Sequence, residues 1–140
     1  MSRNIDSDFS KNILDFSSIN ELKFENGIYI LSEDIDLKQN YLFPKNKKLI
    51  IKEGVNVIFS EDVILLSEGS ILFNGTKEKP IRVYSDNAQG SIILQNNIYK
   101  FNNIEFDNLS YPKDMNKILY GGVNIINSKV YISNTLIKNS

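Results

Sequence analysis

Two stretches of this 140-residue chain repeat each other. GSIILQNNIYKFNNIEFDN (90–108) and GGVNIINSKVYISNTLIKN (121–139) align without a gap, so the offset between them is constant. Apolar residues coincide at five pairs: Ile92 with Val123, Leu94 with Ile125, Tyr99 with Val130, Phe101 with Ile132 and Phe106 with Ile137. Successive coils of a solenoid require this regularity, because each inward side chain stacks on its equivalent one coil away. An antiparallel sandwich does not.

Asparagines also coincide in the repeat. The pairs are Asn96 with Asn127, Asn103 with Asn134, and Asn108 with Asn139. Asparagine tolerates the left-handed conformation and can satisfy nearby backbone groups, so these positions are predicted to be corners, where like amides can form a ladder. The same alignment places Asp107 beside Lys138 on neighbouring strands.

Short strands with period-2 alternation fill residues 49–86 and are separated by turns. A glycine-led phrase recurs five times, as NGIYIL, EGVNVIF, EGSILFN, QGSIILQ and YGGVNII, and each glycine is expected to allow a positive φ. No helical interval separates the strands, which excludes βαβ crossovers. We therefore predict an all-β fold, a right-handed parallel β-helix fragment of about four to five irregular coils, with an antiparallel β-sandwich as the alternative.

The chain divides into a cap segment, residues 1–26, and β-helix coils, residues 27–140. Phe9, Ile13 and Phe16 have helical spacing after a candidate N-cap at Asp8, which predicts a short helix covering the first coil. Because the sequence stops directly after a strand, we expect the coils to be the front part of a longer solenoid.

Composition excludes several chemistries. The chain has no Cys and no His, which excludes thiol nucleophiles, disulfides, the usual zinc sites and the Ser-His-Asp triad. A net charge of −1 does not favour nucleic acid. One basic cluster, predicted to be either a solvated turn or an anion-binding patch, consists of Lys45, Lys47, Lys48 and Lys52. Neither a secretory signal nor a membrane span is evident, so a location outside the cell would have to be encoded by a longer exported parent chain.

The sequence pattern of residues 27–108 resembles that of bacterial right-handed parallel β-helix repeat proteins. The segments that carry the resemblance are LIIKEGVNVIF, SILFNGTKEKPIRVYSD and GSIIL. Residues 108–140 resemble the β-helix segment of large bacterial surface proteins, some of which carry a spore-coat-kinase-like domain. The resemblance implies a surface scaffold that continues with further coils. It carries over no catalytic residue, because the Asp clusters with Arg, Lys or His of β-helix pectate lyases and polygalacturonases are not recognisable here.

Two pairs of carboxylates alternate along predicted strands, so each pair faces one way. They are Asp34 with Asp36, and Glu105 with Asp107. Such pairs can act as acid and base in glycoside hydrolysis or hold Ca²⁺. The alternative is that they form the solvated face of an outer strand.

Four tyrosines are candidates for stacking on sugar rings. Tyr29 and Tyr84 are expected to point outward, and Tyr111 and Tyr120 lie in or beside an inserted stretch, residues 109–120, expected to be a loop. Scattered surface aromatics are the alternative.

These observations predict a non-catalytic scaffold or glycan-binding module of a larger bacterial surface protein. The alternatives are part of a polysaccharide lyase or glycoside hydrolase acting through the four carboxylates, and a self-associating structural piece. Expected partners are a polysaccharide, and the rest of a longer chain or another copy at the last coil. We expect no metal or other cofactor, no nucleic acid and no membrane insertion.

Overall fold

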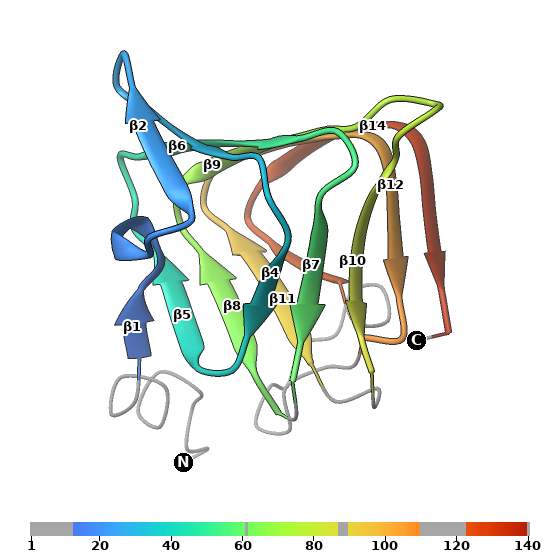
Figure 1. Cartoon of the computed structure of the whole chain (residues 1–140), viewed down its shortest axis with the longest axis horizontal. Coiled ribbons are helices and arrows are strands. Elements are labelled where there is room, and N and C mark those ends of the chain that lie inside the picture. The colour runs from blue at the N-terminus through green and yellow to red at the C-terminus, as the bar shows by residue number, and fades with distance from the viewer. Residues whose placement is uncertain (1–12, 61, 87–89, 110–122, 140) are drawn as a thin grey trace.

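The computed structural model describes residues 13–60, 62–86, 90–109 and 123–139. These residues form a parallel β-solenoid of about 4 turns, with a nearly all-β content (Figure 1). Every strand pair in the described residues is parallel except one hairpin, β2 (Leu22–Glu25) with β3 (Ile28–Leu31). The prediction of a parallel solenoid is therefore confirmed, and the antiparallel sandwich is excluded.

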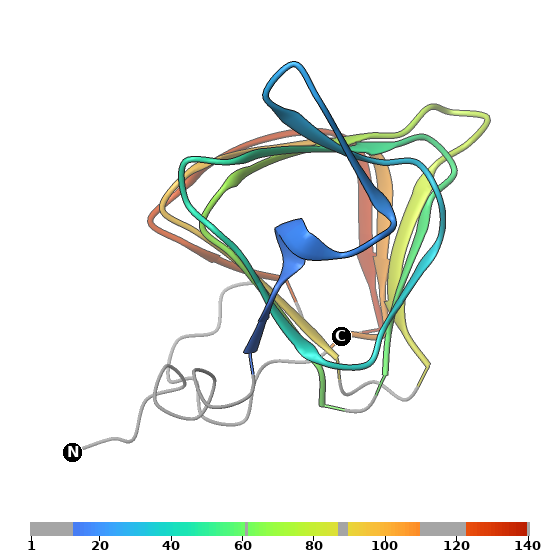
Figure 2. The same cartoon turned by 60° about the vertical axis from the view of Figure 1, so that its left-hand side comes forward.

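The coils have three sides, seen nearly end-on in Figure 2. The first side is a separate sheet of β1 (Ile13–Asp15), β5 (Asn40–Phe43), β8 (Ile64–Ser67), β11 (Ser91–Gln95) and β13 (Val123–Ile126). The second side stacks β3, β6 (Lys48–Lys52) and β9 (Ser70–Asn74), and the third stacks β4 (Ile35–Leu37), β7 (Asn56–Phe59) and β10 (Ile81–Ser85). Two long strands, β12 (Ile98–Asp107) and β14 (Lys129–Lys138), run along both of these sides.

The register predicted by the repeat is confirmed at all five apolar pairs. β11 pairs with β13 so that Ile92 lies beside Val123, and β12 pairs with β14 so that Phe101 lies beside Ile132. Earlier coils are shorter and unequal: Leu49 pairs with Ile71, and Ile71 pairs with Tyr99, so the sequence separation differs from one coil to the next. The unequal lengths explain why the earlier coils show no fixed spacing in the sequence.

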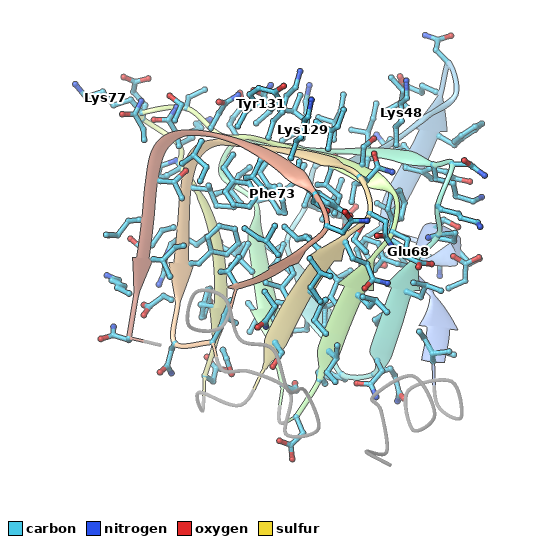
Figure 3. The ribbon with its side chains drawn as sticks, turned by 180° about the vertical axis from the view of Figure 1, so that it is seen from behind. Lys48, Glu68, Phe73, Lys77, Lys129 and Tyr131 are labelled. Carbon is cyan, nitrogen blue, oxygen red and sulfur yellow. The ribbon has the colours of Figure 1, made fainter. Side chains whose placement is uncertain are left out.

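Aromatic side chains fill the interior between the second and third sides. Phe73, Phe101 and Phe106 are buried, and their ring centroids lie 5.1 to 5.9 Å apart. Figure 3 shows Phe73 inside the coil. Burying each such side chain contributes about 1.5 to 3 kcal/mol to stability. The stacked inward columns therefore provide most of the driving force for coil formation.

The paired asparagines lie at corners with left-handed backbone, as predicted. All six have φ between 48° and 60°. The amide ladder forms at one corner, where Asn127 Nδ2 donates to Asn96 Oδ1 at 2.9 Å. At the other two corners Asn103 and Asn108 donate to backbone carbonyls instead.

The glycine prediction is only partly correct. Among the described glycines, only Gly27 and Gly54 have positive φ, at 79° and 75°. Gly90 is required for a different reason, because a Cβ there would overlap the Phe59 side chain. The phrase therefore repeats for two physical causes, backbone conformation and close packing.

A short 3₁₀ turn, η1 (Phe16–Ser18), lies across the N-terminal end of the coils (Figure 2). Its Phe16 is 1% exposed and packs edge-on against Tyr41 and Phe43, with centroids 5.6 and 6.3 Å apart. The helix predicted within residues 8–24 is wrong over the described residues, which form β1, η1 and β2. Sheet pairing of residues 13–15 with β5 overrides the helical spacing.

The C-terminal end is open by contrast. In the described part of the chain β14 pairs only with β12. Its inward Ile132 and Ile137 are 61% and 38% exposed, although their register partners Phe101 and Phe106 are buried. The last described coil therefore presents an unpaired edge and an apolar column.

The outer surface of the first side carries a second, small apolar cluster. Leu66 and Ile93 lie on this surface and are 7% and 1% exposed. Asn124 follows them in the same column, fully buried, and its Oδ1 has no hydrogen-bond partner among the described residues. In the described residues, no helix has the length and apolar character needed to cross a membrane.

Candidate functional site

Glu105 and Asp107 meet two cations on the outside of the third side. Arg82 lies beside both, with its Nε 3.2 Å from Glu105 Oε2 and its Nη2 3.8 Å from Asp107 Oδ2. Lys138 Nζ lies 3.6 Å from Glu105 Oε2, and the predicted pairing of Asp107 with Lys138 is confirmed by the register. The two carboxylates are therefore charge-compensated.

The other two predicted acids lie elsewhere on this side. Asp34 Oδ1 accepts a hydrogen bond from the Asn56 backbone amide at 2.8 Å, which fixes the turn before β4. Asp36 shares an outward column with Ile58, Tyr84 and Asp107. Three strand spacings separate Asp36 from Asp107, about 14 Å, which exceeds the separation of a glycosidase carboxylate pair. The structure does not bring the four acids together.

A hollow of about 430 Å³ lies next to Glu105. Its walls come from the β9–β10 loop and from the corner of the two long strands; they include Thr76, Lys77, Asn103, Asn134 and Leu136. Within the described residues, no group of three or more Asp or Glu side chains could hold a metal ion. Glu105 is the one carboxylate in the lining of this hollow, and it is already paired with Arg82.

The two tyrosines of the predicted row that lie in the described residues do not share one surface. Tyr29 pairs with Leu49 in an inward column and packs against Phe43, at a centroid distance of 6.1 Å, so the expectation that it points outward is wrong. Tyr84 does point outward, where the Arg82 guanidinium lies 4.4 Å from its ring centroid. Tyr111 and Tyr120 lie outside the described residues, as does most of the predicted 109–120 loop. Tyr29 and Tyr84 therefore lie on different sides and cannot stack on one ligand.

The outer surface of the second side has a different composition, and we name it the lysine face. It consists of the outward residues of β3, β6 and β9 and of the first halves of β12 and β14. Its lysines are Lys48, Lys52, Lys100 and Lys129, and its apolar residues are Ile28, Ile30, Ile50, Leu72, Ile98 and Tyr131. These outward strand positions include no Asp or Glu, and the nearest acid along the sheet is Glu25 of β2, which pairs with Ile28 at the edge. No ion pair joins the four lysines to another described residue.

A hollow of about 390 Å³ lies on the lysine face. Half-buried Ile50 and Leu72 contribute to its lining, together with Lys48 and Lys100. Figure 3 shows Lys48, Lys129 and Tyr131 projecting from the same surface, while Glu68 lies at the corner that bounds it. The arrangement can hold an extended ligand against apolar side chains, with ammonium groups beside it.

The sequence alone does not predict that Arg82 pairs with the acids, or that lysines from different coils form one face. Lys48 and Lys52 are close to Lys45 and Lys47 along the chain, but Lys47 instead donates to the Tyr29 hydroxyl at 3.1 Å. Lys48 belongs spatially with Lys100 and Lys129, which lie in later coils and far from it in the sequence. The sequence signal is the even spacing of Lys48, Ile50 and Lys52 in KLIIK, which places them on one face of a strand, and the same spacing of Ile98 and Lys100 in IYK.

Searches against protein-family models, curated proteins and solved structures find no match to this chain. The functional argument therefore rests on the geometry of its surfaces.

Proposed function

We propose that this chain is a non-catalytic solenoid scaffold that binds an extended glycan, as a module of a larger bacterial surface protein. The observation that carries the proposal is the lysine face, where β3, β6, β9 and β12 line one hollow and half-buried Ile28, Ile50 and Leu72 contribute to its lining. Sugar rings expose apolar C–H faces, and a hollow with an apolar floor and a few polar groups is the usual form of a ligand site.

Two features favour binding over catalysis. The acids that could serve as an acid/base pair form separate groups, and Glu105 and Asp107 are each occupied by Arg82. Asp34 is committed to the Asn56 amide. The location within a bacterial surface protein rests on the resemblance in residues 108–140 alone.

Binding to a panel of immobilised polysaccharides tests the proposal. Ile50→Ser should weaken binding, because it removes apolar surface from the hollow. Ile58→Ser is the matched control, since Ile58 is also an outward, half-buried strand isoleucine but lies on the third side. Both variants should unfold at similar temperatures. Equal loss of binding in the two variants, or turnover of any polysaccharide by the unmodified chain, would contradict the proposal.

The open C-terminal end favours a second candidate function, self-association. Ile132 and Ile137 are exposed on an unpaired edge, whereas η1 covers the N-terminal end. Two copies would therefore meet through their C-terminal ends, in an isologous contact. Sedimentation at several protein concentrations should show dimers that Ile132→Lys abolishes. Phe24→Lys is the control, because Phe24 is 60% exposed at the other end. A monomer at all concentrations would exclude this candidate.

A further inference from the structure

The two outer surfaces of the solenoid differ in how their charges are compensated. The net charge is −1, yet the outward strand positions of the lysine face hold four lysines and no acid. On the third side, by contrast, Glu105 and Asp107 are paired with Arg82 and Lys138 at outward positions of neighbouring strands. Cations gathered on one face without counter-charges create a local positive potential, even on a chain of near-zero net charge.

The lysines are distributed along the solenoid axis and do not converge on one point. Lys48 and Lys129 occupy the same outward column, through Ser70 and Ile98, and are three strand spacings apart, about 14 Å. Lys100 lies on β12 between them and belongs to the neighbouring column. A small anion would contact one lysine at a time. An elongated ligand that carries repeated negative groups would contact several, and many weak exposed contacts then add up.

The shape of the face favours a chain over a membrane. Amphipathic surfaces that enter a bilayer bury an apolar face among the headgroups and acyl chains. Here Ile50 and Leu72 are half-buried in the lining of a hollow that also includes Lys48 and Lys100. A polymer strand can lie in such a hollow with its apolar faces on Ile50 and Leu72 and its anionic groups beside the ammonium groups.

We infer that the glycan held by the lysine face is anionic, a polysaccharide bearing carboxylate or sulfate groups that pair with Lys48, Lys100 and Lys129. The inference rests on the proposed glycan binding and specifies its ligand class. Because the contacts are exposed ammonium groups, binding should weaken as salt screens them.

The test uses the whole chain and two matched pairs of polymers. Carboxymethylcellulose is compared with hydroxyethylcellulose, and dextran sulfate with dextran, so that charge changes while the backbone is kept. We expect each anionic polymer to bind about tenfold more tightly than its neutral partner at low salt, with the difference lost at about 0.5 M NaCl. The two anionic arms distinguish carboxylate from sulfate as the preferred group.

A triple variant, Lys48→Gln with Lys100→Gln and Lys129→Gln, should lose about tenfold in affinity for the anionic polymers. The matched control is Lys38→Gln with Lys77→Gln and Lys79→Gln, which removes the same charge from outside the face and should retain the affinity. Replacing the first three lysines by arginine should restore binding.

The outcomes separate the two proposals. Equal binding of charged and neutral polymers would overturn the anionic class and leave glycan binding intact. Binding of no polysaccharide would overturn both. Preferential binding of single-stranded DNA or of phosphatidylglycerol vesicles, lost in the lysine triple variant, would assign the face to another polyanion and also overturn both.

Discussion

The two ends of the solenoid differ in how the apolar interior is covered. At the N-terminal end Phe16 of η1 covers the interior and is 1% exposed. At the C-terminal end Ile132, in the column of Ile51, Phe73 and Phe101, is 61% exposed. Stacking supplies each coil with two apolar neighbours, and an end coil has only one unless a cap replaces the other. The contribution of an inward residue to stability therefore depends on its position along the solenoid axis and not on residue type alone.

The largest expected effect is the loss of the cap. Phe16→Ala should lower the free energy of unfolding by about 3 to 5 kcal/mol, because it removes a fully buried ring and leaves a cavity against Tyr41 and Phe43. Chemical denaturation measures the change. Phe24→Ala is the control at the same end, since Phe24 is 60% exposed, and it should cost about 1 kcal/mol or less. Similar costs for the two variants would mean that the N-terminal end is not closed by Phe16.

The next effect reports whether the last coil stays packed over Tyr99. Burial raises the pKa of Tyr99 to about 12, and its hydroxyl lies within hydrogen-bond distance of the Ser67 and Gln95 carbonyls. Below pH 10 both the folded and unfolded states carry a neutral tyrosine. Between pH 10 and about 12 the unfolded state ionises first, so stability should fall by about 2 to 3 kcal/mol.

Stability measured from pH 9 to 12 in the unmodified chain and in Tyr99→Phe checks this prediction. The variant should lack that component of the alkaline decline. Tyr99 pairs with Val130 of the last coil, so an alkaline decline that is the same in both proteins would show that this coil frays and exposes the hydroxyl.

A smaller effect concerns the cap of η1. Partial burial works to raise the pKa of Asp15, but hydrogen bonds from the Ser17 side chain and backbone outweigh it and lower the pKa. The contribution of Asp15 to stability is thus present above pH 3.8 and is lost as the pH falls through the lowered folded-state pKa. Asp15→Ala should cost about 0.5 to 1 kcal/mol near neutral pH. A thermal melt measures it, and an unchanged melting temperature would argue against the cap.

The smallest effect is expected at the open end. Ile132→Ala should change the free energy of unfolding by less than about 1 kcal/mol, whereas Ile51→Ala in the same column should cost about 2 to 5 kcal/mol, because Ile51 is 2% exposed. The same denaturation experiment compares them at low protein concentration. A large cost for Ile132→Ala that grows with protein concentration would show that another copy covers this end.

The candidate surfaces were less predictable than the fold. The sequence points to the four acids but not to the partner of Glu105, because Arg82 lies in the preceding coil, whose length differs from that of the repeat. The sequence predicts the wrong surface for Tyr29 for a related reason. The alternation in GIYIL permits either phase, and only pairing with Leu49 places the ring inside.

The sequence by itself determined the stacking of the last two coils and the conformation of their corners. The constant offset of the repeat fixes which apolar residues meet, and asparagine at a corner adopts the left-handed conformation for local steric reasons. Only the tertiary structure decided which residues of the shorter, unequal coils meet. Their register follows from long-range strand pairing across turns of different length, and that pairing gathers Lys48, Lys100 and Lys129 on one face and closes one end with Phe16.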